Sequence, residues 1–444
     1  MPPQQSHHND NIQAFRQQFQ HAPQFLVQAP GRVNLIGEHT DYNLLPVLPM
    51  PISRFITLTV SSRPDQVIQI HSTQPDHSPL RLSLDQPITR HPEQWANYPL
   101  AALQALLAHA ANSSGEPPRG FNALVHADLP PAAGLSSSSA LVIATCLTFL
   151  HVNNIEMPRP RIAELMRLAE QFVGTAGGGM DQAAITLGEP HQALLIEFDP
   201  LNTRPVPIPD GLEIFIVNSG QKAEKSGAAR YNFNRRALEC VLGVELLKAN
   251  DATSHVEGSH AWESLRDIYH SCQNQSLPWQ PLLAHLPQTG LTPAEIEQLI
   301  PLDRLQHLAE AKKLSWDQHA EWLPDHCLHI APRVQHVLRE ADRVYAMEKA
   351  FERGDLPAAF ELSQASHASC RDLYDISTPR IETLIHQLYA IKAGSVRITG
   401  AGFGGCVVAL VRKEDATAFH ASALHLDPNT IHAQSHGGAQ IVRL

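Results

Sequence analysis

The sequence predicts an α+β fold, and three observations support this prediction. Segments with the periodicity of strands and segments with the periodicity of helices are mixed in both halves of the chain. Residues 53–61 and 66–71 alternate in the manner typical of antiparallel strands. Near the other end, two short apolar segments, 396–399 and 406–411, are separated only by a glycine loop, which predicts another antiparallel pair.

In the first half, helices are expected where apolar residues recur every three or four positions or where the segment is polar and rich in Gln. These helices are expected at residues 10–19, 93–109, 134–149 and 161–173. Further strands are expected at the short apolar segments 121–126 and 193–198. The Pro-rich stretch 200–209 is predicted to be a linker, which divides the chain into an N-terminal domain (1–205) and a C-terminal domain (206–444).

In the second half, a strand is expected at 212–217 and a helical stretch at 232–248. Two more helices are expected at 334–354 and 357–368. Between them, residues 254–323 have a helical, His- and Gln-rich composition and contain no motif. We therefore expect a helical insertion near residues 250–330 within the C-terminal domain.

Composition excludes several classes of protein. The 33 Lys and Arg against 44 Asp and Glu give a net charge of −11, which argues against a nucleic acid or an anionic membrane as partner. No apolar run reaches the length of a membrane helix, and the first 15 residues lack the apolar core of a secretion signal. The six cysteines are spread over the whole chain without CxxC spacing. Because this is not the pattern of a disulfide framework, we expect a cytoplasmic protein with reduced cysteines.

A serine-rich segment follows the expected strand at 121–126. Gly134-Leu-Ser-Ser-Ser-Ser-Ala140 connects that strand to a helix, and exposed N–H groups at a helix start favour an anion such as phosphate. The alternative is an ordinary serine N-cap, for which one hydroxyl is enough. No GK[ST] sequence occurs anywhere, so an ATP-binding protein with this sequence is not a P-loop enzyme.

Two further glycine segments have more than one interpretation. Gly400-Ala-Gly-Phe-Gly-Gly405 contains GxGxxG but precedes a strand, so a hairpin that allows close backbone approach fits better than a dinucleotide site. Gly177-Gly-Gly-Met-Asp181 places a carboxylate directly after three glycines. That Asp either acts as a base near a bound substrate or simply caps the following helix.

The densest polar segment is Gly31-Arg-Val-Asn-Leu-Ile-Gly-Glu-His-Thr-Asp-Tyr-Asn43. Its Arg, Glu, His and Asp offer hydrogen-bond donors and acceptors to a polyhydroxyl ligand, and the alternative is an exposed loop joined by salt bridges. Together with the serine segment and the two glycine segments, it resembles the signatures of the GHMP kinases, and within them the galactokinases. Further galactokinase-like segments are Trp95-Ala-Asn-Tyr98 and Ser366-His-Ala-Ser-Cys-Arg-Asp372.

The resemblance covers about residues 25–411 and implies a fold and an activity. The implied fold has an N-terminal domain like ribosomal protein S5 domain 2 and a C-terminal ferredoxin-like domain, with substrates bound between them. The implied activity is ATP- and Mg²⁺-dependent phosphorylation of the anomeric hydroxyl of galactose, giving galactose 1-phosphate. We expect a monomer in the cytoplasm whose partners are the sugar and ATP, with no nucleic acid or membrane.

The resemblance also implies roles for individual residues. Asp181 corresponds to the catalytic carboxylate, and Arg32 to the arginine that keeps it ionised and offsets charge on the γ-phosphate. The residues that correspond to the sugar pocket are Glu38, His39, Asp41, Gly178, Phe233 and Tyr231. The residues that correspond to the ATP site are Trp95, Gly134, Leu135, Ser136, Ser137, Ser138 and Ser139. Ser138 and Glu170 correspond to the ligands of Mg²⁺.

Several departures from the family pattern concern the choice of sugar. Leu44 and Leu45 replace the usual Asp-Gly, and Ala132 replaces a glycine, as it does in the N-acetylgalactosamine kinase branch. Phe233 aligns with the usual sugar-pocket tyrosine, and Tyr231 lies two residues earlier. N-acetylgalactosamine kinase is therefore the alternative activity, and an inactive regulator that binds galactose and ATP is a second alternative.

Overall fold

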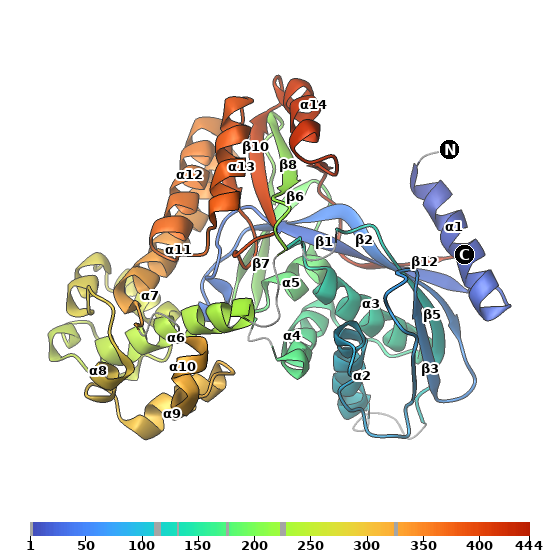
Figure 1. Cartoon of the computed structure of the whole chain (residues 1–444), viewed down its shortest axis with the longest axis horizontal. Helices are drawn as coiled ribbons and strands as arrows, with labels where there is room; N and C mark the ends of the chain where they lie inside the picture. The colour runs from blue at the N-terminus through green and yellow to red at the C-terminus, as the bar shows by residue number, and fades with distance from the viewer. Residues whose placement is uncertain (1–2, 111–116, 131–132, 175–176, 223–227, 324–326) are drawn as a thin grey trace.

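The structure is a computed structural model that describes residues 3–110, 117–130, 133–174, 177–222, 228–323 and 327–444. Within these residues, the strands form a six-stranded sheet, a four-stranded sheet and a two-stranded sheet, with helices packed against them (Figure 1). This mixture confirms the predicted α+β class. Among the described residues, no helix is both long enough and apolar enough to cross a membrane.

The six-stranded sheet has the order β12-β1-β2-β5-β3-β4. Its strands are β1 (Phe25–Asn34), β2 (Pro49–Ser62), β3 (Val67–Ser72), β4 (Leu80–Ser83), β5 (Phe121–Ala127) and β12 (Gln440–Arg443). The segments predicted as antiparallel strands, β2 and β3, do not pair with each other, because β5 lies between them and is parallel to β3. Their antiparallel neighbours are β1 and β5 for β2, and β4 for β3.

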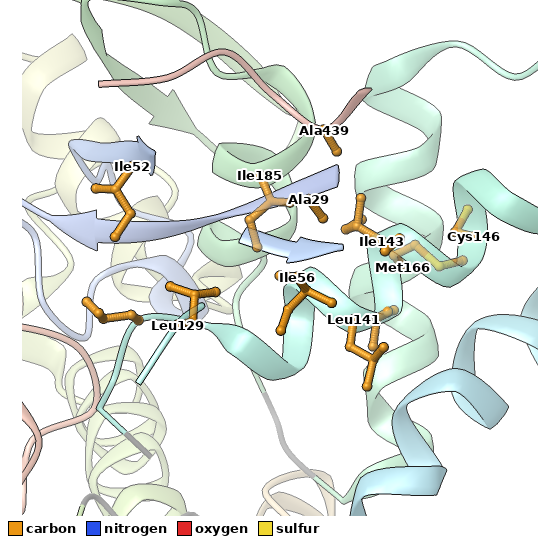
Figure 2. Close-up of a cluster of buried hydrophobic side chains, with 14 of the residues drawn as sticks. Ala29, Ile52, Ile56, Leu129, Leu141, Ile143, Cys146, Met166, Ile185 and Ala439 are labelled. Carbon is orange, nitrogen blue, oxygen red and sulfur yellow. The ribbon is translucent and has the colours of Figure 1, made fainter. Parts of the chain in front are cut away.

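Helices cover this sheet, and those from α2 to α5 contribute to the first hydrophobic core. They are α1 (Pro3–Phe19), α2 (Asn97–Ala110), α3 (Ser137–Val152), α4 (Arg159–Ala169) and α5 (Met180–Leu187). α3 and α5 pack directly on β1 and β2, whereas α2 packs on α3, and α4 on α5. In this core Ile143 of α3 and Ile185 of α5 lie near Ala29 of β1 and Ile56 of β2 (Figure 2). The core therefore fixes α3 and α5, whose N-termini carry the serine and glycine segments.

The Pro-rich stretch predicted as a linker is a strand instead. β6 (Gln192–Glu197) pairs antiparallel with β7 (Asn202–Pro207), with Leu194 opposite Pro205 and Gln192 opposite Pro207. Proline has no N–H to donate, so it is tolerated only where a strand has an unpaired side. β7 pairs with β6 alone, which explains how a Pro-rich sequence can form this strand and why the linker prediction was wrong.

The four-stranded sheet has the order β11-β8-β10-β9 and is antiparallel throughout. Its strands are β8 (Leu212–Asn218), β9 (Ser395–Ile398), β10 (Cys406–Arg412) and β11 (Ile431–Ala433). Helices connect β8 to β9, a glycine loop connects β9 to β10, and α14 (Ala416–Leu426) connects β10 to β11. This β-α-β-β-α-β succession is that of the ferredoxin-like fold, as predicted.

The connection from β8 to β9 is long and helical. Its principal helices are α6 (Ala228–Lys248), α11 (Ile330–Arg353), α12 (Leu356–Asp372) and α13 (Pro379–Ala390). Between α6 and α11 lie the helices α7 (Leu265–Asn274), α8 (Pro293–Glu297), α9 (Leu302–Ala311) and α10 (His319–Trp322). Asp342 of α11 accepts hydrogen bonds from Tyr269 Oη over 2.7 Å and from Trp279 Nε1 over 3.2 Å. The helical insertion is thus attached to the same helix that approaches the site described below.

The last strand of the chain joins the sheet of the first half. β12 pairs antiparallel with β1, with Arg443 opposite Phe25 and Gln440 opposite Gln28. Ala439, directly before β12, is buried in the core of that sheet (Figure 2). The division at residues 205 and 206 therefore stays a prediction, and any such division leaves one strand of the second segment in the sheet of the first.

Candidate active site

Arg32 and Asp181 form an ion pair. Arg32 follows a shift in the pairing of β1 with β2 between Pro30 and Gly31, where the extra residues 53 and 54 lie on β2. Arg32 Nε donates to Asp181 Oδ1 over 2.7 Å, and Arg32 Nη1 donates to the Gly134 carbonyl over 2.6 Å. The Asp181 side chain remains 17% exposed while that of Arg32 is 4% exposed. A carboxylate with a balancing positive charge is thus accessible beside the serine segment.

Asp41 lies next to this pair. Burial raises the pKa of Asp41, and the negative charge of Asp181 raises it further. The backbone N–H groups of Tyr42 and Met180 donate to the Asp41 carboxylate over 2.9 and 3.4 Å. Because Met180 begins α5, the loop after β1 and the start of α5 bring two carboxyl groups to one place.

Gly178 makes a backbone contact that no other residue could make. A Cβ at this position would lie 2.2 Å from the carbonyl carbon of Asp41 and 2.2 Å from the nitrogen of Tyr42. At Gly177, by contrast, a Cβ would meet nothing within 4 Å. The middle glycine of the three therefore allows the two loops to touch.

The Glu38 carboxylate is occupied by groups of the protein. Arg397, on β9, is ion-paired with Glu38 Oε2, and the Gly400 N–H donates to Glu38 Oε1 over 3.0 Å. Both side chains are almost completely buried, at 0% for Arg397 and 1% for Glu38. Glu38 thus joins the loop after β1 to the glycine loop after β9.

His39 also contacts that glycine loop. Its Nε2 lies 3.2 Å from the Ala401 carbonyl oxygen, and its Nδ1 lies 2.8 Å from Tyr42 Oη. Burial, together with a smaller effect of the nearby His336, lowers the pKa of His39 to about 3. The imidazole is therefore neutral at physiological pH.

Phe233 and Tyr231 occupy different surroundings on α6. The Phe233 ring packs 5.4 Å from the ring of His39 and 5.3 Å from that of Tyr42, measured between centroids. Tyr231 is half-buried and packs against the hydrophobic core of the second half. Phe233 therefore contacts the loop after β1.

The serine segment leaves two buried hydroxyl groups without a partner among the described residues. Ser136, at the N-cap of α3, has a left-handed backbone (φ 59°), and its side chain makes no capping hydrogen bond. The Oγ atoms of Ser136 and Ser139 are buried and unpaired. The alternative interpretation of these serines, a plain N-cap, is therefore not what the structure shows. Ser137 begins α3, and the Leu135 carbonyl accepts the Arg32 N–H over 3.2 Å.

The third glycine segment lies against the serine segment. A Cβ on Gly400 would lie 3.0 Å from the Gly134 carbonyl oxygen, and the Cys406 N–H donates to the Ala133 carbonyl over 3.2 Å. The interpretation of 400–405 as a loop for close backbone approach is thus confirmed by its geometry, and what it approaches is the serine loop.

Tyr98 is influenced by both Ser138 and Glu170. Burial raises the pKa of Tyr98, the negative charge of Glu170 raises it further, and a hydrogen bond with Ser138 opposes the shift. A hydroxyl from α3 thus bonds to Tyr98, and the charge of a carboxylate from the turn at Glu170–Val173 reaches the same side chain. No group of three or more His, Cys, Asp or Glu side chains arranged to hold a metal occurs among the described residues.

Trp95 lies in the short helix Gln94–Ala96, directly before α2. Its ring stacks on His77 with centroids 4.9 Å apart, and its Nε1 donates to Glu93 Oε2 over 2.9 Å. It is nearly buried, and the chain places it three residues from Tyr98.

Sequence reasoning missed the buried polar residues of the second half that hold the loop after β1. Glu340 of α11 accepts the Gly37 N–H over 3.0 Å, and His336 Nε2 lies 3.1 Å from the Glu38 carbonyl oxygen. Arg397 was missed as well. The available signal was an arginine inside the apolar strand segment Ser395–Ile398, where a buried charge needs a partner.

Comparisons with known proteins agree with this geometry. Family models match residues 13–62 (galactokinase galactose-binding signature), 97–189 (GHMP kinases N terminal domain) and 347–424 (GHMP kinases C terminal). A crystal structure of Lactococcus lactis galactokinase complexed with galactose superimposes with a TM-score of 0.74 at 24% identity, covering 97% of this chain and 99% of that chain. Methanococcus jannaschii mevalonate kinase superimposes with a TM-score of 0.55 at 16% identity, covering 93% and 99%.

The two sheets and the three loops that meet between them define a GHMP kinase. Galactokinase of Chloroflexus aurantiacus is 33% identical over 412 residues, covering 92% of this chain and 89% of that protein. Galactokinase of Chloroflexus aggregans is 31% identical over 414 residues, covering 93% and 90%. The chain belongs to the galactokinase family.

Proposed function

We propose that this protein transfers the γ-phosphoryl group of ATP to the anomeric hydroxyl of galactose and so forms galactose 1-phosphate. One observation carries the proposal. Arg32 binds Asp181 on one side and the Gly134 carbonyl of the serine loop on the other, so it lies where a sugar hydroxyl and a phosphate would meet. The galactokinases that resemble this chain over nine tenths of its length support the same activity.

Asp181 would act on the reacting hydroxyl. Phosphoryl transfer needs positioning and neutralisation of charge more than covalent chemistry. Arg32 favours the ionised form of Asp181, so this carboxylate can accept the hydroxyl proton or orient the hydroxyl toward the phosphorus atom. The same guanidinium would also offset negative charge that develops on the transferred group.

The sugar would bind against the loop after β1 and the start of α5. Asp41 would offer a half-buried carboxyl group to the sugar hydroxyls, and Gly178 allows the two loops that would border the sugar to touch each other. Glu38 and His39 border the same place, although their polar atoms already contact Arg397, Gly400, Tyr42 and Ala401. Phe233 would form the apolar side of the pocket, with Tyr231 two residues earlier on α6.

ATP would bind at the serine loop. The unpaired hydroxyls of Ser136 and Ser139 and the first N–H groups of α3 are groups that phosphate oxygens can satisfy. Gly134, Leu135, Ser137 and Ser138 complete this loop, and Trp95 would border the adenine.

Mg²⁺ fits the oxygen atoms at the far side of the loop. It prefers oxygen ligands and commonly takes only one or two from the protein, and the Ser138 hydroxyl and the Glu170 carboxylate, which both influence Tyr98, would supply them. When bound, the ion would neutralise charge on the phosphates.

We also propose a cytoplasmic monomer without nucleic-acid or membrane partners, which is consistent with the acidic composition and with six free cysteines.

The activity is tested by coupling ADP release to a panel of galactose, N-acetylgalactosamine and glucose, with the product identified by phosphorus NMR. The expected result is turnover of galactose with phosphate on the anomeric oxygen and strong rejection of glucose. Turnover of N-acetylgalactosamine without turnover of galactose would show that the acetylated sugar is the substrate. Binding of galactose and ATP without any turnover would show a regulator instead.

A further inference from the structure

Four polar side chains form a continuous line of hydrogen bonds behind the proposed sugar pocket. His39 Nδ1 lies 2.8 Å from Tyr42 Oη, and Tyr42 Oη lies 2.7 Å from Tyr374 Oη. Tyr374 Oη lies 3.3 Å from Cys240 Sγ. At the other end, His39 Nε2 lies 3.2 Å from the Ala401 carbonyl oxygen. The line therefore runs from Cys240 on α6, through Tyr374 just after α12 and the loop after β1, to the glycine loop after β9.

The positions of the hydrogen atoms follow from what each group can do. A carbonyl oxygen only accepts, so His39 Nε2 must carry the proton that faces Ala401. A neutral imidazole has one N–H, so His39 Nδ1 accepts and the Tyr42 hydroxyl donates to it. The single proton of Tyr42 is then used, so Tyr374 donates to Tyr42.

The neutral state of His39 rests on its surroundings as well as on burial. Burial is the largest cause of its low pKa, and the neighbouring His336 and Arg236 act in the same direction, whereas Glu340 opposes them. Burial also raises the pKa of Cys240 to about 11, so the last group of the line remains a protonated thiol. All the hydrogen bonds then point one way, from Cys240 toward Ala401, and such chains strengthen each member.

Tyr374 is fixed independently of this line. Arg236 Nε donates to the Tyr374 carbonyl over 2.8 Å, and Arg236 Nη2 donates to Asp375 Oδ2 over 2.7 Å. The Tyr374 ring packs 4.7 Å from the ring of His39 and 4.4 Å from that of His336. The hydroxyl of Tyr374 is therefore held at one place from the second half of the chain, and the loop after β1 is oriented against it.

We propose that Tyr42 and Tyr374 are positioning residues of the sugar site, which hold His39 as the Nε2–H tautomer facing the loop 400–405. His39 lies between Glu38 and Asp41 in the loop that would bind the sugar. The expected effect of the two tyrosines on the KM for galactose therefore rests on the proposed function. Neither tyrosine needs to touch the sugar, since both act through the imidazole.

The alternative is that both tyrosines only fill space. Phenylalanine keeps the ring and removes the hydroxyl, so Tyr42→Phe and Tyr374→Phe separate the two roles. Tyr269→Phe is the matched control, because it also removes a hydrogen bond of a largely buried tyrosine hydroxyl, the 2.7 Å bond to Asp342, in the helical insertion.

Kinetics give the first readout. Tyr42→Phe leaves His39 Nδ1 without its donor, so we expect the KM for galactose to rise roughly tenfold, as for one buried acceptor left unpaired. Tyr374→Phe should have a smaller effect, on the order of threefold, because Tyr42 can still donate to His39. The KM for ATP and both constants of Tyr269→Phe should change less than about twofold. An unchanged galactose KM in Tyr42→Phe, or equal effects in all three variants, would overturn the proposal.

Nitrogen-15 NMR of histidine-labelled protein gives a readout that a space-filling role would not move. The His39 signals are assigned by their loss in His39→Gln. In the wild type they should show the neutral Nε2–H tautomer with no titration between pH 5 and 8, and Tyr42→Phe should change this pattern. A wild-type Nδ1–H tautomer, or a pattern unchanged in Tyr42→Phe, would refute the assignment. This test needs no substrate, so it distinguishes failure of the positioning role from failure of the proposed function.

Discussion

Arg397 and Glu38 form an ion pair that is completely withdrawn from water and joins β9 to the loop after β1. Arg397 also donates to the Asn34 carbonyl over 3.2 Å and to Ser366 Oγ over 3.0 Å, and Glu340 lies 3.7 Å away. A buried charge without its partner is costly, so this arrangement makes the two halves of the chain depend on each other at the site.

Replacing Arg397 should therefore destabilise the protein. Arg397→Met leaves Glu38 and Glu340 as buried carboxylates without this cation, and we expect a loss of about 3–5 kcal/mol in the free energy of unfolding. Urea denaturation measures the loss. Arg371→Met, which breaks an exposed pair with Asp372, should cost less than about 1 kcal/mol. The milder Glu38→Gln extends the test if Arg397→Met does not fold, and wild-type stability in both would contradict the account.

Asp181→Asn should lower kcat at least about a hundredfold while the fold survives, because an amide neither accepts the hydroxyl proton nor balances Arg32. Steady-state kinetics measure the loss, and circular dichroism checks the fold. Asp76→Asn, at an exposed position, is the control. Near-normal turnover of a folded Asp181→Asn protein would remove Asp181 from the reaction.

Gly178→Ala and Gly177→Ala form a matched pair. The first places a methyl group 2.2 Å from backbone atoms of Asp41 and Tyr42, so one of the two loops must move. The second places it in open space. We expect Gly178→Ala to raise the galactose KM more than tenfold, as in other cases where a buried contact is lost, and Gly177→Ala to bind galactose normally. Equal affinities, measured by calorimetry, would show that the contact does not position Asp41.

Ser138→Ala and Glu170→Gln should raise the Mg²⁺ concentration needed for half-maximal rate and leave galactose binding unchanged. The reason is that both would supply hard oxygen ligands beside Tyr98. Rates measured over a magnesium titration give the answer, with Glu156→Gln at the exposed surface as control. A metal dependence that is the same in both variants as in the wild type would place the ion elsewhere.

Phe233→Tyr tests the choice of sugar. Phe233 packs against His39 and Tyr42. Compared with a tyrosine, its ring lacks one oxygen atom, so it takes up less volume beside the proposed pocket and donates no hydrogen bond. We expect measurable activity of the wild type on N-acetylgalactosamine, and a shift of the kcat/KM ratio toward galactose in Phe233→Tyr. The comparison is a competition between the two sugars. A wild type with no activity on the acetylated sugar would end this interpretation of Phe233.

Local patterns were sufficient for most of the elements. The expected strand at 406–411 and helix at 134–149 appear as β10 (Cys406–Arg412) and α3 (Ser137–Val152), because periodicity and glycine positions are properties of the segment itself. The linker at 200–209 failed because a Pro-rich sequence can still form a strand that pairs on one side. β12 was not expected, since its partner β1 lies at the opposite end of the chain.

The residues of the candidate site were harder to predict than the elements, because they come together from distant parts of the sequence. Arg32 and Asp181 are 149 positions apart, and only the resemblance to a family paired them before the structure did. The contact of Tyr42 with Tyr374 spans 332 positions, and that of Glu38 with Arg397 spans 359. No local pattern encodes such distances, so the hydrogen-bond line behind His39 came from the structure alone.

The pairing of β12 with β1 has a consequence for synthesis on the ribosome. β1 carries Arg32, and one of its two edges is covered by a strand made more than four hundred residues later. At typical rates of translation, that edge stays open for roughly 20 to 80 s while the rest of the chain emerges. An open strand edge is a template for pairing with other chains. The nascent protein is thus exposed to misassembly until its last strand is translated, and chaperones have that interval in which to act.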